Sequence, residues 1–219
     1  MDRIILASGS PRRRQLLEQV GIAHEVIISG ADETVDGPPE EQARILALRK
    51  AEAVRDVITG RAVSDMITGK SAHCSTGNKG IHDAAGGNTV IIAADTLVYI
   101  DKKVLGKPDG PDDAFDMLKT LQGRCHTVYT GVAVLRVGDD GCMAESFVEA
   151  AKVYFRKLSD AEIWAYIGTG EPFDKAGAYG VQEKGALLVE CVDGDFFTVV
   201  GLPLARLAVT FTEIGIDIW

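Results

Sequence analysis

Asp95 is the first candidate for chemistry, because it lies inside residues 89–100, the most apolar run of the chain. This run is rich in β-branched residues and ends at the charged residues 101–103, which predicts a buried central strand. Burying an ionised carboxylate without a partner costs on the order of several kcal/mol. Asp95 must therefore bind a metal or another cation, remain protonated, or mark the place where the strand opens into a cleft. A structural aspartate that caps a loop is the alternative, and we favour a metal-binding or catalytic carboxylate.

Three consecutive arginines at residues 12–14 open a predicted helix that follows a short apolar strand, residues 3–7. Ser10 fits the N-cap of this helix and Pro11 fits its first position. A helix start presents free backbone N–H groups and the positive end of the dipole, which suit an anion and disfavour nearby cations. An arginine run on a helix is ordinarily a solvated face. In this turn, beside Ser8, it predicts a phosphate-binding site.

Asp32 and Glu33 are adjacent carboxylates on a loop that follows a predicted strand, residues 24–28. Such a loop is ordinarily solvated. The two acids become candidates for a site only as further ligands for a metal held by Asp95.

Two lysines are also candidates for the same site. Lys50 lies within the apolar stripe of a long predicted helix, residues 38–59. Its side chain either snorkels to the surface or directs its ammonium group into a cleft, and the spacing alone leaves both open. Lys107, between Gly106 and Pro108, lies on a stiff loop; it is ordinarily a surface residue, but it is close in sequence to the Asp95 strand.

Residues 60–88 interrupt the helix and strand patterns and predict a long surface loop or insertion. Within them, residues 64–71 resemble a phosphate-binding P-loop, but Ser64 replaces its first glycine and no strand precedes it. A kinase or switch built on this segment would lose its activity on the substitution Lys70→Ala, whereas we expect little effect. The segment also contains side chains that bind metals, without the ligand spacing of a known site: His73, Cys74 and His82.

Downstream of the Asp95 strand, the pattern changes from alternating strands and helices to hairpins. Residues 126–137 and 142–155 predict one hairpin, and residues 187–192 and 196–200 predict another. This succession predicts an α/β fold with a mixed sheet rather than a purely doubly wound one. Further predicted helices cover residues 112–122, 159–167 and 204–214.

The composition is that of an ordinary globular protein, with 219 residues, 46% hydrophobic content, 25% charged content and a net charge of −9. The negative charge argues against a nucleic-acid partner but not against a local basic pocket. The four cysteines form no CxxC pair, which predicts reduced thiols and a cytoplasmic location. The N-terminus lacks the pattern of a signal peptide, and no apolar stretch has the length of a membrane span, so we expect no membrane partner.

Together these residues resemble the Maf family of nucleoside triphosphate pyrophosphatases, also called septum formation proteins. The resemblance covers a single Maf-like domain, residues 1–219, from which residues 60–88 depart as a longer connection than is usual in the family. The matching motifs, which occur in the family's order, are Leu6-Ala7-Ser8-Gly9-Ser10-Pro11-Arg12-Arg13, Asp32-Glu33, Lys50-Ala51, Ala94-Asp95-Thr96, Gly106-Lys107-Pro108, Asp174-Lys175-Ala176-Gly177-Ala178-Tyr179-Gly180-Val181-Gln182 and Val200-Gly201-Leu202-Pro203.

The resemblance implies a mixed, twisted sheet with flanking helices and two lobes around a central cleft, similar to inosine triphosphate pyrophosphatases, and a homodimer. It implies hydrolysis of a nucleoside triphosphate to the monophosphate and pyrophosphate, with Mg²⁺ or another divalent metal such as Mn²⁺. Asp95 matches the proposed catalytic base and, with Glu33, would hold the metal. The other positions that match or supplement the phosphate site are Ser8, Arg13, Lys50, Lys107 and Lys175.

Arg12, Thr96 and Gln182 match the positions that set base preference, and they resemble the subgroup acting on dTTP and UTP. The side chains of Gln182 and Thr96 can each donate and accept hydrogen bonds, as a pyrimidine carbonyl and ring N–H require. Asp95 would orient or deprotonate a water for attack on a phosphorus, and the α position is the simplest route to these products. The alternative is a non-catalytic, nucleotide-binding regulator of cell division and septum formation, which would need no buried carboxylate.

Overall fold

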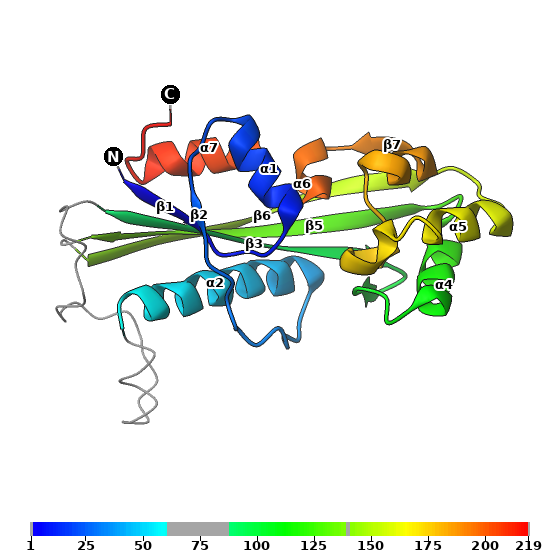
Figure 1. The fold of residues 1–219 in the computed structure, drawn as a ribbon, viewed down its shortest axis with the longest axis horizontal. Coiled ribbons are helices and arrows are strands. Elements are labelled where there is room, and N and C mark those ends of the chain that lie inside the picture. The colour runs from blue at the N-terminus through cyan, green and yellow to red at the C-terminus, as the bar shows by residue number, and fades with distance from the viewer. Residues whose placement is uncertain (1, 61–87, 139–140, 219) are drawn as a thin grey trace.

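A computed structural model of the chain describes residues 2–60, 88–138 and 141–218. Within these ranges the strands form a seven-stranded mixed sheet in the order β2-β1-β3-β5-β6-β7, with the short β4 paired to β3. β1 runs parallel to β2 and β3, and the other pairs are antiparallel. The sheet extends along the whole molecule (Figure 1). The strands are β1 (Arg3–Leu6), β2 (Glu25–Val26), β3 (Thr89–Ile100), β4 (Lys103–Leu105), β5 (Cys125–Gly138), β6 (Gly141–Phe155) and β7 (Val189–Asp193).

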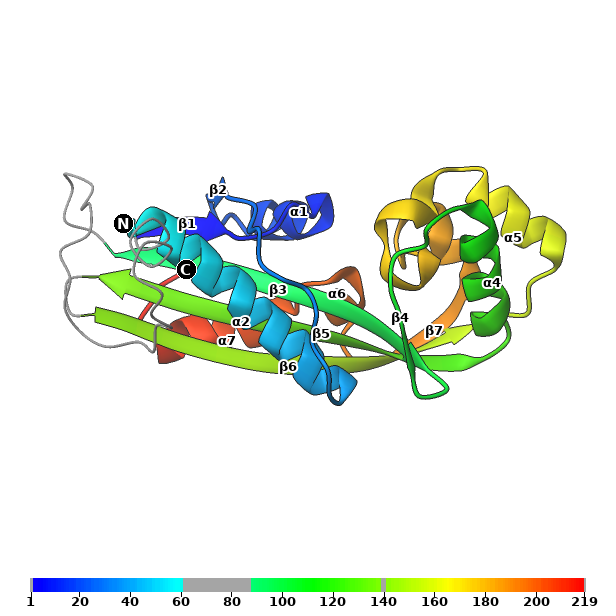
Figure 2. The same cartoon turned by 90° about the horizontal axis from the view of Figure 1, so that it is seen from below.

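Helices cover both faces of the sheet. α2 packs diagonally across one face, and α1 and α7 lie on the opposite face (Figures 1 and 2). α4 and α5 pack together at the far end of the long strands. The helices are α1 (Pro11–Gln19), α2 (Pro39–Ile58), α4 (Pro111–Leu121), α5 (Asp160–Ile167), α6 (Phe196–Val200) and α7 (Leu204–Glu213), with the 3-10 helices η1 (Glu171–Asp174), η2 (Ala176–Ala178) and η3 (Glu183–Leu188).

The long strands pass through two separate regions of core, which define two lobes. In the first lobe, alternate residues of β3 face opposite ways: Ile91 and Ala93 pack under α2, whereas Val90 and Ile92 pack under α1 and α7. In the second lobe, Val98 and Ile100 at the end of β3 pack against α4 and α5. The residues of β3 between the two cores are only partly buried.

One edge of β3 is interrupted between the lobes. β1 pairs with β3 as far as Leu6 opposite Ile92, and β4 pairs with it again from Val98. Among the described residues, no strand pairs with residues 93–97 on this side, whereas β5 pairs with them on the other. Because ligands of open α/β sheets gather beyond the carboxyl ends of parallel strands, the end of β1 at this gap is where a site is expected.

The predicted mixed α/β fold with flanking helices is confirmed, and β3 has the predicted bounds. The predicted second hairpin is wrong: β7 is followed by the helix α6 rather than by a strand at residues 196–200. The carboxylate of Asp195 accepts hydrogen bonds from the N–H groups of Phe197 and Thr198, and this N-cap starts a helix despite the β-propensity of the residues that follow.

Two other predictions differ from the structure or lie outside it. The strand expected at residues 24–28 is reduced to β2. The P-loop-like segment 64–71 and the residues His73, Cys74 and His82 lie outside the described residues. None of the described helices has the length and apolar character needed to span a bilayer.

Candidate active site

A cavity of about 660 Å³ lies at the gap in the sheet edge, where the two lobes meet. Ligand sites in proteins typically have volumes of about 300–1,000 Å³. Asp32, which was considered as a further metal ligand, does not line this cavity, but the ten residues assigned to the site from the sequence do: Ser8, Arg12, Arg13, Glu33, Lys50, Asp95, Thr96, Lys107, Lys175 and Gln182. Residues that are far apart in the sequence, on α1, α2, β3 and several loops, are thus gathered around one space.

Asp95 is paired with a cation, as its burial requires. Its Oδ1 atom lies 2.5 Å from Nζ of Lys50, whose side chain is 13% exposed, and its own side chain is 14% exposed. The same Nζ lies 2.8 Å from Oε1 of Glu33, a mostly exposed carboxylate. Lys50 therefore directs its ammonium group into the cavity instead of snorkelling outward. The hydrogen bond from Lys50 holds the pKa of Glu33 below its usual value, because it outweighs the opposite effect of partial burial.

The position of Asp95 follows from the register of the sheet. Asp95 lies opposite Gly131 of β5, and both residues face α2. A Cβ atom on Gly131 would lie 2.2 Å from the carbonyl oxygen of Ala43, so the missing side chain lets α2 approach the sheet closely. α2 carries Lys50 two turns further along.

Arg13 is buried beside Asp95, and neutral oxygen atoms hold its guanidinium group. Nε donates to the carbonyl of Gly201 at 2.7 Å, Nη1 donates to Oγ of Ser8 at 2.9 Å, and Nη2 donates to Oγ1 of Thr96 at 2.9 Å. Burial lowers the pKa of Arg13 to about 10, although the negative charge of Asp95 opposes the shift. Arg13 is therefore a charged group at neutral pH whose hydrogen bonds leave its positive charge available to a ligand.

The hydrogen-bond chain below Arg13 fixes the direction of the Thr96 hydroxyl. Oγ1 of Thr130 donates to the carbonyl of Thr198 at 2.7 Å, so its proton is already used. The 3.0 Å contact between the hydroxyls of Thr96 and Thr130 must then carry the proton of Thr96. In this arrangement Thr96 can accept a hydrogen bond from a ligand but cannot donate one. The sequence had predicted that it could do both.

The Ser8 hydroxyl has the opposite character. Its oxygen accepts from Arg13 and from the backbone N–H of Ser10, at 2.9 Å and 3.2 Å. Both lone pairs are thereby used, and among the described residues its proton has no acceptor. Ser8 is therefore a donor directed at a site beside the start of α1, where backbone N–H groups also favour an anion.

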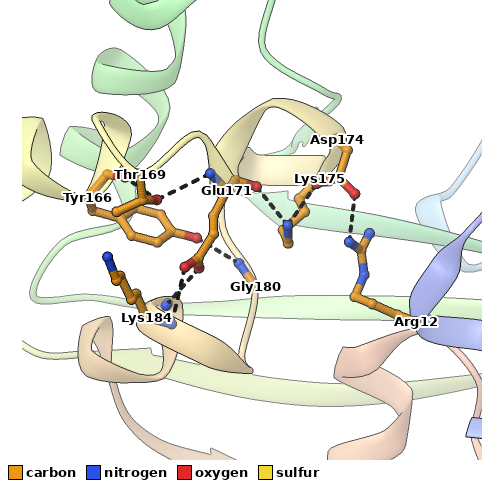
Figure 3. A network of polar contacts seen from close by, with 9 residues as sticks. Arg12, Tyr166, Thr169, Glu171, Asp174, Lys175, Gly180 and Lys184 are labelled. Atoms are coloured by element: carbon orange, nitrogen blue, oxygen red, sulfur yellow. Dashed lines mark hydrogen bonds and ion pairs between the residues drawn. The ribbon is translucent and has the colours of Figure 1, made fainter. Parts of the chain in front are cut away.

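Arg12 and Lys175 meet at a carboxylate that the sequence reasoning missed as a site residue. Asp174 accepts from Nη1 of Arg12 at 2.8 Å and from Nζ of Lys175 at 2.7 Å (Figure 3). Partial burial would raise the pKa of Asp174, but these two hydrogen bonds outweigh it and hold the pKa below its usual range. Asp174 belongs to the same sequence motif as Lys175 and Gln182, and this membership could have indicated that it is a site residue.

Lys107 and Gln182 complete the cavity wall. The positive charge of Lys107 contributes to the low pKa of Glu33. The loop that carries Lys107 is tied to η2 by a 2.9 Å hydrogen bond from the N–H of Gly177 to the carbonyl of Gly106. Gln182 occupies the N-cap position of η3 without a capping hydrogen bond from its side chain, so its amide can serve a ligand.

A second group missed from the sequence lies behind the cavity wall. Tyr179 lines the cavity, and its hydroxyl lies 2.7 Å from Nε2 of the buried His126. Burial lowers the pKa of His126 to about 4, so its imidazole is neutral at pH 7. Both rings pack edge-on against Phe155. Nothing in the sequence around His126 indicated this contact, because its partner is distant in the chain.

The chain has extensive similarity to known proteins. The family model described as Maf-like protein matches residues 3–214. A dTTP/UTP pyrophosphatase of Caldicellulosiruptor saccharolyticus is 42% identical over 222 residues, which cover 100% of this chain and 98% of that protein. Proteins of the same name from Moorella thermoacetica and Bacillus cereus are 42% and 37% identical, again over 100% of this chain and 98% of each relative.

Proposed function

The chain belongs to the Maf-like protein family, and we propose that it is a nucleoside triphosphate pyrophosphatase that hydrolyses dTTP and UTP to the monophosphate and pyrophosphate. The relatives are named for this activity, and this chain matches them over nearly their full length. The observation in this chain that supports the proposal most is the convergence of cationic side chains and one buried carboxylate on a single cavity. Such a cavity suits a polyanion that is to be hydrolysed.

The triphosphate would lie among the cations of the cavity, in a protein that is acidic overall. Arg13, Lys50 and Lys107 supply positive charge, and the Ser8 hydroxyl and the N–H groups at the start of α1 supply hydrogen bonds to phosphate oxygens. Positioning and charge neutralisation of this kind account for most of the rate in phosphoryl transfer.

A divalent ion, Mg²⁺ or Mn²⁺, fits the donor set that the chain provides. Asp95 and Glu33 offer hard carboxylate oxygens that already share one cation, the ammonium group of Lys50. Among the described residues there is no group of three or more acidic, histidine or cysteine side chains that could hold a metal. Two carboxylates completed by substrate phosphates and water are a usual Mg²⁺ arrangement. When bound, the ion would neutralise phosphate charge and make a water molecule more acidic.

Asp95 is the residue that would handle the proton. Its carboxylate would orient a water molecule towards the phosphorus and accept its proton, and attack at the α position gives the monophosphate and pyrophosphate directly. Lys50 holds this carboxylate in place through a 2.5 Å contact. The chain's part in the reaction would thus be to hold the base, the water and the triphosphate in position for the attack.

The pyrimidine base would lie towards Thr96 and Gln182. Thr96 can accept from a ring N–H, and the Gln182 amide can donate to a ring carbonyl. Uracil and thymine present both groups side by side and adenine presents neither, which supports their selection over adenine.

The sequence resemblance also supports finer proposals. A homodimer follows the family pattern. A cytoplasmic location agrees with the free thiols of Cys125 and Cys191. A role in septum formation rests on the family name alone.

The proposal is tested by a pyrophosphate-release screen across UTP, dTTP, ATP and GTP, with and without Mg²⁺. We expect release from UTP and dTTP to be fastest and to require the ion. Purine nucleotides ahead of pyrimidines would overturn the specificity, and tight nucleotide binding with no release from any substrate would favour the non-catalytic regulator.

A further inference from the structure

Asp174 is an acidic residue at the rim of a cavity that we assign to a polyanion. A carboxylate in this place repels phosphate and weakens binding unless it has another task. Its side chain is 54% exposed, yet both of its oxygens are engaged, one by Arg12 and one by Lys175. The contacts of Asp174 indicate that its task concerns these two cations rather than the substrate.

The Arg12 guanidinium depends on Asp174 for its position. Among the described residues, Asp174 is its hydrogen-bonding partner, through the 2.8 Å contact from Nη1. Arg12 is on α1 in the first lobe, and Asp174 ends η1 in the second. The ion pair therefore crosses between the lobes beside the cavity, and it sets where the guanidinium lies relative to Gln182 and Thr96.

The second lobe holds Asp174 firmly enough to serve as a reference point (Figure 3). Nζ of Lys175 donates both to Asp174 and, at 2.7 Å, to the backbone carbonyl of Glu171. The Glu171 carboxylate in turn accepts from the backbone N–H groups of Lys184 and Gly185, at 3.3 Å and 3.2 Å. The chain of contacts thus runs from the backbone of η3 through Glu171, Lys175 and Asp174 to Arg12.

We propose that Asp174 is a positioning residue for base selection, which holds Arg12 at the base-binding end of the cavity and keeps it from pairing with the triphosphate. This inference rests on the proposed function, because it assigns Arg12 to the base rather than to the phosphates. An arginine released from Asp174 could reach any nucleotide's phosphates, and those contacts are the same for purines and pyrimidines.

The test is the variant Asp174→Asn, which has the same shape but offers one oxygen to two cations. We expect the ratio of kcat/KM for UTP to kcat/KM for ATP to fall about tenfold, the contribution of one charge-assisted hydrogen bond. The loss should come from KM for UTP, with kcat within about twofold of the wild type. In an Arg12→Ala background, Asp174→Asn should leave the ratio unchanged, because its effect passes through Arg12.

The matched control is Asp101→Asn, which removes another exposed aspartate–arginine pair, Asp101 with Arg124 at 2.6 Å, at the β3–β4 turn. This variant should keep the wild-type ratio, and Asp174→Glu should recover part of it. An unchanged ratio in Asp174→Asn, or an equal loss in the Arg12→Ala background, would overturn the inference while wild-type hydrolysis of UTP continued. Absence of hydrolysis in the wild type would instead defeat the proposed function.

Discussion

Two hydroxyl groups of the cavity differ in what they can offer a ligand, although serine and threonine have the same hydrogen-bonding groups. Ser8 has used its lone pairs and keeps its proton, whereas Thr96 has given its proton to Thr130 and keeps an acceptor. The difference comes from their partners. Under the proposed function, Ser8 would therefore donate to a phosphate oxygen and Thr96 would accept from a ring N–H.

Replacing Ser8 by alanine should raise KM for UTP about tenfold and change kcat little, because a ground-state hydrogen bond to an anion is lost. Steady-state pyrophosphate release measures both constants. Ser146→Ala is the matched control, since Ser146 also accepts from an arginine, Arg44 at 3.2 Å, but lies outside the cavity lining. A tenfold fall in kcat with KM unchanged would contradict the role assigned to Ser8.

The sequence was sufficient to select most of the polar residues that gather in the cavity, some from their chemistry and others, such as Thr96 and Gln182, from the family resemblance. It was not sufficient to give their hydrogen-bond directions. The proton of Thr96 is placed by Thr198, which is on α6 far along the chain. Asp174 likewise became a site residue only once Arg12 was seen to pair with it.

The close packing of α2 against β5 positions the site, because α2 carries Lys50. Gly131 lies opposite Asp95, and Ala43 of α2 lies directly over it. The sequence predicted α2 and β3 well because each has a long, regular apolar pattern. It did not predict α6, where a short run of β-branched and aromatic residues is turned into a helix by the Asp195 N-cap.

Gly131→Ala should push α2 from the sheet and displace Lys50 from Asp95. We expect a loss of stability of about 1–3 kcal/mol, as for other overpacked cores, together with reduced turnover. Denaturant unfolding and pyrophosphate release are the measurements. Gly30→Ala is the control, because a Cβ there meets no atom within 4 Å, and its stability should stay close to wild type. Equal stability of the two variants would show that α2 does not pack as described.

At the scale of the whole molecule, the site exists because two lobes share the long strands while the sheet edge between them is open. The sequence indicated a mixed sheet, since strand–helix alternation gives way to hairpins. β4 pairs with the end of β3 as a local hairpin, but the strand order and the near edge of the gap at residues 93–97 depend on the long-range pairing of β1 with β3, which no local pattern encodes.

The buried His126 couples the stability of the molecule to pH. Its pKa is lowered from 6.5 to about 4 in the folded chain, so below pH 6.5 the unfolded chain takes up the proton first. Stability should therefore fall as the pH drops from 6.5 towards 4, by roughly 2 kcal/mol at pH 5. The variant His126→Gln keeps a hydrogen-bonding group for Tyr179 but cannot titrate.

Unfolding free energies measured at pH 7 and pH 5 check this expectation. The loss between the two pH values should be smaller in His126→Gln than in the wild type, since the carboxylates contribute equally to both. The same loss in both proteins would mean that His126 is not held neutral by burial.

The central claim is that Asp95 acts as the base in a nucleotide-hydrolysing cavity, and the most direct measurement is pyrophosphate release from UTP by Asp95→Asn. This variant keeps the size of the side chain, and a melting curve checks that it remains folded. We predict that kcat falls by at least about 100-fold, the lower end for loss of a general base. Release at a rate close to that of the wild type would contradict the account.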